Sequence, residues 1–462
     1  MSTRLLVALI GLTVLSGCAP SATTSGSPPG SETTGSGVAA STSPARTGSL
    51  VLVGRIVTMA EPAVAEALLI EDGTVTAVGT RADVLALASG QVSVIDIGQN
   101  VAYPGFIDAH AHWIGDRDYY GIDTPAAAMD AAIARGWTSI SEQWVDAGKL
   151  AELEALAAGN VLPLRVDAYL ALNGVHPGEH YGDWYVDHQR GAVGDRHRVQ
   201  GLKIHLDSGT GAIMLWEPAD LTGAIGRANA AGWQISVHSV STEAQAAALD
   251  AFEAAIGADG PNPLHHRIEH ALQVTDDQLA RMVAMDLVPV VQLDGTAYDW
   301  VTWAASEPGE SGRDYQKEDL DWLARWRDFV DAGLHVAATS DAPWFFPDHT
   351  LADDVGRPVD EIAGAMDGRG RTFPETPSWM LDQLLTAEQG LRAVTLDAAY
   401  ALGDDARRGH LAPGTVGDVT ILSGDVTAAT PDEIRAMTVI ATIVGGIPVH
   451  CPDPEVCAQF GR

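Results

Sequence analysis

Short apolar segments alternate with helical segments through the middle of this chain. The apolar segments predict strands at 105–109, 138–141, 164–168, 201–206, 234–237, 267–270, 288–292 and 335–339. Helical patterns fit between them at 126–135, 147–158, 221–231, 242–255, 275–285 and 320–332. Repeated strand–helix units indicate a parallel sheet, because parallel strands need a crossover connection between them. Eight such units predict an α/β fold, a (β/α)8 TIM barrel with insertions.

The segments that flank this region have the pattern of short strands and turns. They cover residues 49–103, before a barrel at 104–410, and residues 411–450, before a tail at 451–462. A chain of 462 residues is long for a single hydrophobic core, so a second and smaller unit is expected. We expect the two flanking segments to pair into one small composite β-sandwich.

The N-terminus has the pattern of an export signal. A charged start precedes an apolar run at 5–15 that is too short to span a bilayer comfortably. The run ends in Leu15-Ser16-Gly17-Cys18, which resembles the bacterial lipobox. Residues 1–17 are therefore predicted to be a lipoprotein signal peptide, with Cys18 as the lipidated first residue of the mature protein. The alternative is an ordinary cleaved signal peptide with an incidental cysteine.

A flexible tether is predicted at residues 18–48, which consist almost entirely of Ser, Thr, Gly, Pro and Ala. Such a composition cannot bury enough apolar surface to fold. Together with the lipidation site, it predicts an extracytoplasmic lipoprotein held at the bacterial cell membrane through its N-terminal lipid alone. Outside the cytoplasm, Cys451 and Cys457 are expected to form a disulfide, since as a metal pair they lack further ligands nearby.

The charge balance is strongly acidic, with 61 Asp and Glu against 27 Lys and Arg and a formal net charge of −34. This excess argues against nucleic acid or anionic lipid surfaces as partners, because both are themselves negative. A small-molecule substrate is expected instead, and homo-oligomerisation is left open.

The first predicted strand ends in two histidines. A Pro104-Gly105 turn precedes an apolar run that leads to His110 and His112. Residues two apart on a strand share one face, so both imidazoles are expected to aim at one point. Imidazole is a common ligand of zinc and similar divalent ions. The alternative at this point is a pair of hydrogen-bonded core histidines.

Further candidate ligands follow at the ends of later strands, where TIM barrels place their chemistry. On the fourth strand Lys203, His205 and Asp207 are expected to face the barrel axis. Carboxylated by carbon dioxide, Lys203 would bridge two ions, whereas the alternative is a lysine paired with Asp207. The later strand ends supply His238, His270 and Asp341. This set predicts a site for one or two divalent ions, with zinc expected first.

The order of these residues resembles the amidohydrolase superfamily, and more narrowly amidohydrolase family 3, the YtcJ-like branch. The matching stretches are 104–112, 202–209, 237–239, 266–271, 339–343, 386–400 and 411–422. The resemblance implies that His110, His112 and Asp341 hold a more buried ion. It also implies that His238 and His270 hold a more exposed ion, with Lys203 bridging the two as its carbamate. The chain departs from the branch directly after His238 and Asp207, so no substrate is carried over.

The expected function is hydrolysis of a C–N bond, in an amide or cyclic amide, by metal-activated water with Asp341 as the general base. One alternative is a lactone, carbamate or phosphoester hydrolase on the same site, and another is a metal-bearing lipoprotein that only binds its ligand. Five residues near the strand ends are candidates for substrate binding: Glu142, His176, Asp207, Gln292 and Trp344.

Overall fold

The computed structural model describes residues 49–209, 211–295, 322–344, 355–370, 375–376 and 378–461. The predicted signal peptide at 1–17, the lipidation site Cys18 and the tether at 18–48 lie outside the described residues. No helix within the described ranges is long and apolar enough to cross a membrane.

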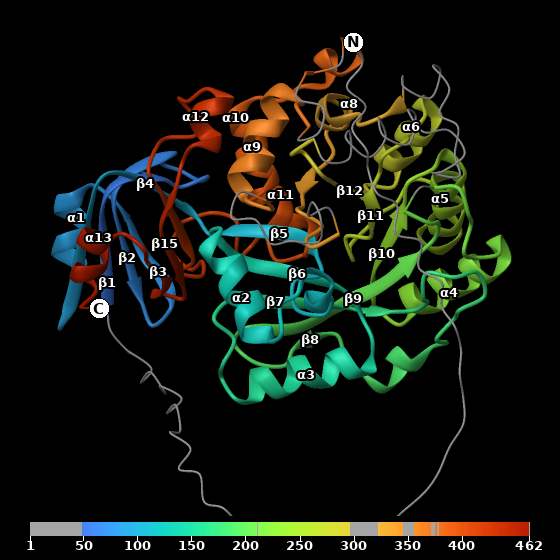
Figure 1. Ribbon diagram of the computed structural model, residues 1–462, viewed down its shortest axis with the longest axis horizontal. Coiled ribbons are helices and arrows are strands. Elements are labelled where there is room, and N and C mark those ends of the chain that lie inside the picture. The colour runs from blue at the N-terminus through green and yellow to red at the C-terminus, as the bar shows by residue number, and fades with distance from the viewer. Residues whose placement is uncertain are drawn as a thin grey trace, which may run out of the picture. The chain divides into compact units, whose positions relative to one another are not determined.

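Eight parallel strands form the larger sheet, and the α/β barrel predicted from the sequence is confirmed (Figure 1). In order of pairing the strands are β5 (Phe106–Ala111), β6 (Trp137–Val145), β7 (Arg165–Ala171), β9 (His197–His205), β10 (Gln234–Ser239), β11 (Arg267–His270), β12 (Val288–Val291) and β13 (Ala337–Ala338). A short strand, β8 (Gly191–Ala192), pairs antiparallel with β9.

Two backbone hydrogen bonds join the first barrel strand to the chain that follows the last. The amide of Asp341 donates to the carbonyl of His110 at 3.2 Å, and the amide of His112 donates to the carbonyl of Ala342 at 2.7 Å. The barrel sheet is thus nearly closed at the end where the candidate ligands lie. This seam fixes Asp341 against the two histidines.

Helices connect the barrel strands and cover their outer face (Figure 1). They are α2 (Pro125–Ala134), α3 (Ala147–Ala158), α4 (Pro218–Ala230), α5 (Thr242–Ile256), α6 (Asp276–Ala284), α8 (Trp326–Asp331), α9 (Pro358–Asp367), α10 (Ala387–Ala393) and α11 (Leu396–Ala401), with 3-10 turns η1 (Arg117–Tyr120), η2 (Trp184–Asp187) and η5 (Ser378–Gln383). Several begin at a capping side chain that accepts a hydrogen bond from the first turn, as Thr275 does for α6 in a complete capping box.

The smaller sheet combines both ends of the described chain. Its strands pair in the order β16 (Ile447–His450), β15 (Val439–Val444), β14 (Val419–Leu422), β4 (Val92–Pro104), β1 (Ser49–Val57), β2 (Val64–Glu71) and β3 (Thr74–Gly79). The antiparallel pairing of β14 with β4 joins the late strands to the early ones, which Figure 1 shows as red beside blue. The helices α1 (Arg81–Leu87) and α12 (Pro431–Arg435) follow β3 and β14. The flanking segments therefore form one composite β unit.

Asp418 links this unit to the barrel. Its buried carboxylate receives hydrogen bonds from the Arg165 guanidinium, at 2.6 Å from Nε, while its backbone carbonyl accepts from the amide of Gly105 at 2.9 Å. A side chain at Gly105 would collide with Thr138 and Asp418, which explains a glycine just before β5. The strand that carries the two histidines is thereby fixed at its start.

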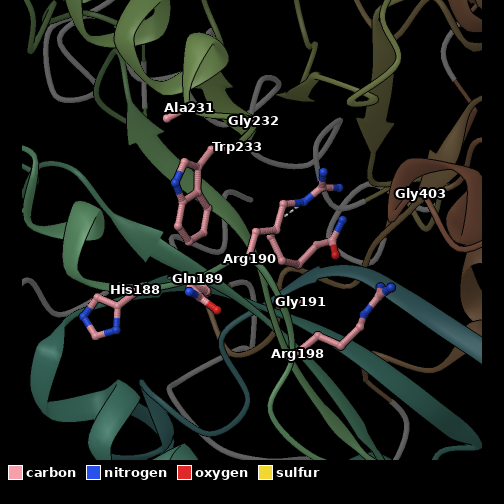
Figure 2. Close-up of a pocket in the computed structure, with 10 residues that line it drawn as sticks. His188, Gln189, Arg190, Gly191, Arg198, Ala231, Gly232, Trp233 and Gly403 are labelled. Atoms are coloured by element: carbon pink, nitrogen blue, oxygen red, sulfur yellow. Dashed lines mark hydrogen bonds between the residues drawn. The ribbon is translucent and has the colours of Figure 1, made fainter.

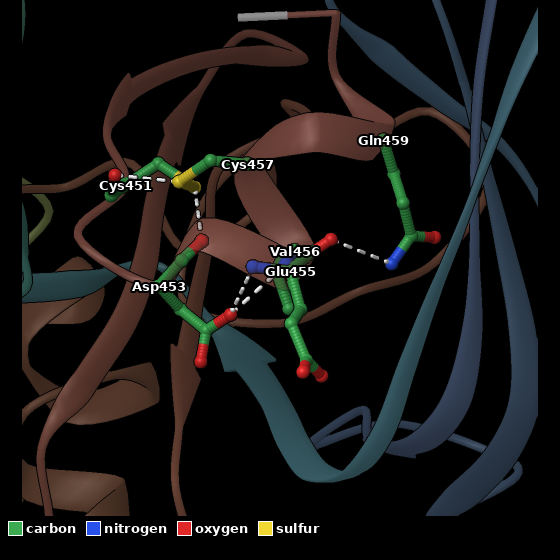
Figure 3. Close-up of a disulfide and its surroundings, with 6 residues drawn as sticks. All are labelled: Cys451, Asp453, Glu455, Val456, Cys457 and Gln459. Atoms are coloured by element: carbon green, nitrogen blue, oxygen red, sulfur yellow. Dashed lines mark hydrogen bonds between the residues drawn. A yellow bond between two sulfur atoms is a disulfide. The ribbon is translucent and has the colours of Figure 1, made fainter.

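The C-terminal tail is held by a disulfide and by side-chain hydrogen bonds. Cys451 and Cys457 are bonded to each other, and the carboxylate of Asp453 caps α13 (Pro454–Gln459), the helix that contains Cys457 (Figure 3). Gln459 then accepts a hydrogen bond from the amide of Asp96 and donates one to its carbonyl. The tail therefore packs on β4 of the composite sheet.

Candidate metal centre

Three candidate ligands converge at the seam of the barrel. His110 and His112 lie on β5 and directly after it, and Asp341 follows β13. The Nε2 atoms of the two histidines are 3.3 Å apart, and Oδ1 of Asp341 lies 3.3 Å from His110 Nε2 and 3.6 Å from His112 Nε2. All three side chains are buried. Their donor atoms thus surround one point.

Carboxylates behind the two histidines orient the rings. Oε2 of Glu269 lies 2.6 Å from Nδ1 of His110, and Oδ2 of Asp116 lies 3.0 Å from Nδ1 of His112. A carboxylate at Nδ1 favours a proton on that nitrogen and leaves the Nε2 lone pair available. Burial opposes ionisation of Asp116, but the contacts with His112 and Lys149 outweigh it and lower the pKa of Asp116 to about 2.

Asp341 occupies an unusual backbone conformation, with a φ of 47°. Non-glycine residues adopt this region rarely, and they keep it where neighbouring contacts enforce it. Here the Asp341 amide is held by the His110 carbonyl, and the Thr339 hydroxyl also donates to that carbonyl. Asp108, on the same strand as His110, accepts from both the amide and the hydroxyl of Ser340. The backbone around Asp341 is therefore determined by β5.

Lys203, His238 and His270 lie beside this group. The rings of His238 and His270 have centroids 4.4 Å apart, and the His270 ring lies 5.0 Å from that of His110. Lys203 is completely buried, and its Nζ atom has no hydrogen-bond partner within the described part of the chain. Burial lowers the pKa of Lys203 to about 8. An uncompensated buried amine is costly unless the site supplies a partner.

The residues present fit a divalent metal. Burial, reinforced by the charge of Lys203, holds the pKa of His110 well below its usual value, and burial lowers that of His270 to about 3. These imidazoles are therefore neutral, which is the state that binds a metal. The imidazole nitrogens of His110 and His112 together with the carboxylate of Asp341 form a donor set typical of zinc and related ions.

The five candidates for substrate binding differ in where they lie. The carboxamide of Gln292 is 2.8 Å from His270 Nδ1 and donates to Asp341 Oδ2 at 3.3 Å. The Trp344 ring is 41% exposed and stands edge-on to His112, with centroids 6.1 Å apart. His176 is exposed on the loop after β7. Gln292 and Trp344 thus lie against the ligands, and so does Asp207, whose Oδ1 is 3.5 Å from His238 Nε2.

Glu142 and Asp207 hold loops at the same end of the barrel. Glu142 accepts hydrogen bonds from the amides of Ile114 and Gly115, and burial raises its pKa to about 8. Asp207 accepts from the amides of Val240 and Ser241, just after β10. Both side chains are 1% exposed, so they stabilise the loops that follow two ligand strands.

Sequence reasoning missed Glu269, although it directly precedes the candidate ligand His270. Neighbours on a strand point to opposite faces, which separates these two in an ideal strand. The φ of His270 is 69°, so the backbone leaves the regular strand there and its ring turns into the centre. Arg267 donates to both carboxylate oxygens of Glu269, at 2.5 and 2.8 Å. The sequence signal that could have identified Glu269 is its position two residues after Arg267 in a predicted strand, which places opposite charges on one face.

A polar pocket of about 650 Å³ lies away from these ligands (Figure 2). It is lined by residues that include Arg190, Arg198 and Trp233, near the starts of β9 and β10, whereas His205 and His238 lie toward the ends of those strands. Its lining shares no residue with the candidate ligand set.

Comparison with known proteins identifies the family to which most of the chain is similar. Residues 122–450 match the model of the amidohydrolase family. YtcJ of Bacillus subtilis is 26% identical over 264 residues, which is 55% of this chain and 45% of that protein. An N-substituted formamide deformylase of Arthrobacter pascens is 27% identical over 225 residues, 48% of this chain and 37% of the enzyme. The aligned part thus spans less than half the length of either relative.

Among solved structures, an uncharacterized metal-dependent hydrolase of Pyrococcus horikoshii has a TM-score of 0.66 at 18% identity. The superposition covers 83% of this chain and 99% of that one. At this identity the likeness concerns the fold.

Proposed function

This chain belongs to the amidohydrolase family, and on that premise we propose that it is a metal-dependent hydrolase that cleaves the C–N bond of an amide or cyclic amide. The observation that carries the proposal is the buried group of His110, His112 and Asp341, whose donor atoms all lie within 4.8 Å of one another. It lies at the carboxyl ends of the barrel strands, where TIM barrels carry out their chemistry. One relative is named for acting on N-substituted formamides, which contain such a bond.

Zinc is the ion we propose, held first by His110, His112 and Asp341. A second ion would use His238 and His270, with Lys203 shared between the two. For that, the neutral amine of Lys203 adds to carbon dioxide, forming an N–C bond and releasing one proton. The lowered pKa of Lys203 favours this reaction, because it increases the fraction of neutral amine. When bound, such ions lower the pKa of a water molecule towards about 7 and polarise the scissile carbonyl.

Asp341 is the group we assign to proton transfer. Burial raises its pKa well above the usual value for aspartate, which makes its carboxylate a better proton acceptor. In the hydrolysis Asp341 takes one proton from water and returns it to the leaving nitrogen as the C–N bond breaks and the acyl carbon gains oxygen. Gln292 donates to Oδ2 of Asp341, which leaves Oδ1 directed at the two histidines. Oδ2 is therefore held by Gln292, and Oδ1 points to the place proposed for the metal and its water.

The test combines metal analysis of the purified protein with a hydrolysis panel. The panel contains N-substituted formamides, acetamides and cyclic imides, with lactones, carbamates and phosphoesters as separate arms. We expect at least one equivalent of zinc and turnover of amide members that is lost after chelation and restored by added zinc. Turnover of only lactones, carbamates or phosphoesters would refute the assignment to a C–N bond of an amide. Zinc-loaded protein that turns over no member of the panel would refute the proposal that the protein is a hydrolase.

A further inference from the structure

One polar side chain of β9 lies at the metal centre without a place in the ligand set. His205 is two residues beyond Lys203, so both project to the same face of the strand. The intervening Ile204 is completely buried on the opposite face. The imidazole of His205 has its ring centroid 5.3 Å from that of His238. It therefore borders the centre on the side of the more exposed candidate ion.

Contacts from β6 and from the chain directly after β7 fix the position of His205. The carboxamide of Asn173 accepts from the His205 amide at 3.0 Å and donates to the His205 carbonyl at 2.8 Å. The Trp144 ring stands edge-on to the imidazole, with centroids 5.4 Å apart, and its Nε1 donates to the carbonyl of Asn173. Trp144 has a φ of 57°, a conformation that non-glycine residues keep only where contacts enforce it. The backbone of His205 is thus fixed by Asn173, and its imidazole lies against the ring of Trp144.

The imidazole of His205 has one nitrogen whose hydrogen-bonding capacity is unused within the described part of the chain. Its Nδ1 atom is buried and lacks a hydrogen-bond partner among the residues that the structure describes. Buried polar atoms are nearly always paired, so one left open beside a reaction centre indicates a missing partner. His205 is only half-buried, whereas Lys203 and His238 are buried, so part of this residue is accessible although its Nδ1 atom is buried.

We propose that His205 contacts the substrate, forming a hydrogen bond from its imidazole to a polar group next to the scissile amide, on the His238 side. This assignment rests on the proposed function, because it presupposes an amide bound at the same centre. The class of substrate it favours is an amide with a hydrogen-bonding atom at or beside the C–N bond. An amide that is apolar on both sides would leave Nδ1 without a partner.

Substitutions at position 205 separate this role from metal ligation. His205→Phe keeps a planar ring but cannot form a hydrogen bond. His205→Asn places a polar atom near the position of Nδ1, and His205→Gln near that of Nε2. For the best substrate of the panel we expect His205→Phe to lower kcat/KM by about 5- to 150-fold, the range for leaving a buried polar partner unpaired. His205→Asn should recover more of this loss than His205→Gln, and all three variants should keep the wild-type zinc content.

His197 provides the matched control, at the other end of the same strand. It is also a buried histidine, and its Nε2 atom has no hydrogen-bond partner in the described ranges. His197→Phe should leave kcat/KM within a fewfold of wild type, with thermal melting measured for every variant. Loss of zinc in His205→Phe would overturn the proposal in favour of a metal ligand. Unchanged kinetics in His205→Phe, or equal losses in the Phe, Asn and Gln variants, would also overturn it.

The failure of this inference differs from that of the proposed function. If the wild-type protein hydrolyses no member of the panel, the function fails, and the role of His205 falls with it. If the wild type is active and His205→Phe is equally active, only the role of His205 fails.

Discussion

Glu269 lies 2.6 Å from His110, Oε2 to Nδ1, across 159 residues of sequence. Both side chains are buried, and Arg267 holds both oxygens of the same carboxylate. Burial alone would raise the pKa of Glu269, but Arg267 overcomes this effect and lowers it, so the group is ionised. An ionised carboxylate at Nδ1 fixes the His110 tautomer and aims Nε2 at the other ligands. The geometry of the centre therefore depends on a residue outside the candidate ligand set.

Glu269→Gln should weaken zinc binding by about 10- to 100-fold, the effect typical of removing a partner behind a metal-binding histidine. The amide keeps the shape of the side chain but removes the charge that orients His110. Competition with a chelator of known affinity measures the change. Glu142→Gln, another buried carboxyl that touches no ligand, serves as the control and should bind zinc as the wild type does. Equal affinity in Glu269→Gln would contradict the orienting role.

Asp341→Asn should lower kcat and kcat/KM together by about 10²- to 10⁴-fold, as expected when a positioned acid–base group is lost. Zinc content should fall only modestly, because the amide oxygen can still reach the metal. Metal analysis and steady-state kinetics on the best panel substrate check both parts. Asp341→Ala, which lacks any oxygen, should lose zinc as well. A fully metallated Asn variant that retains near wild-type turnover would exclude Asp341 as the base.

Lys203→Ala should lose at least one equivalent of zinc and most activity, because the buried amine is the group proposed to bridge two ions. Added acetate or propionate is expected to restore part of the activity by occupying the vacated space. Metal content and rates are measured with and without the carboxylate. Full zinc content and full activity in the variant would show that Lys203 has a structural role only and does not bridge two ions.

Glu142→Gln should change how stability depends on pH. In the folded protein the pKa of Glu142 is about 8, against about 4.5 when it is exposed, so the folded state retains its proton longer. The stability from this group is complete below about pH 4.5 and is lost as the pH rises to about 8. Denaturant unfolding of wild type and variant across this window measures the difference. We expect a flatter profile in the variant; identical profiles would place the pKa near its ordinary value.

Cys18→Ala should release the protein from membranes without detergent, because the proposed acyl group would have no thiol to attach to. Fractionation of cells and mass analysis of the N-terminal peptide provide the measurement. Wild-type protein that carries no acyl group and washes off as readily as the variant would reject the anchor.

The sequence by itself determined the strand order and the candidate ligands, because both follow from local rules. Alternation of apolar strands with helices is set by side-chain periodicity and predicts a parallel barrel. The carboxyl ends of such strands meet at one end of the barrel, so residues at these ends are expected to lie close together. Within the set at these strand ends, the resemblance to the amidohydrolase superfamily implies that His110, His112 and Asp341 hold one ion, and the structure brings these three together.

Only the tertiary structure decided which polar side chains contact the candidate ligands and which form hydrogen bonds to the backbone of nearby loops. Glu142 lies at a strand end as the ligands do, yet its carboxyl group binds backbone amides of a nearby loop. The carboxylate of Asp207 binds the amides of Val240 and Ser241 and also lies 3.5 Å from His238 Nε2. Glu269 reaches His110 because the barrel brings β11 and β5 to one axis, a contact that no local pattern encodes. The physical reason is that strand periodicity fixes the face on which a side chain lies, whereas its partner depends on the curvature and closure of the sheet.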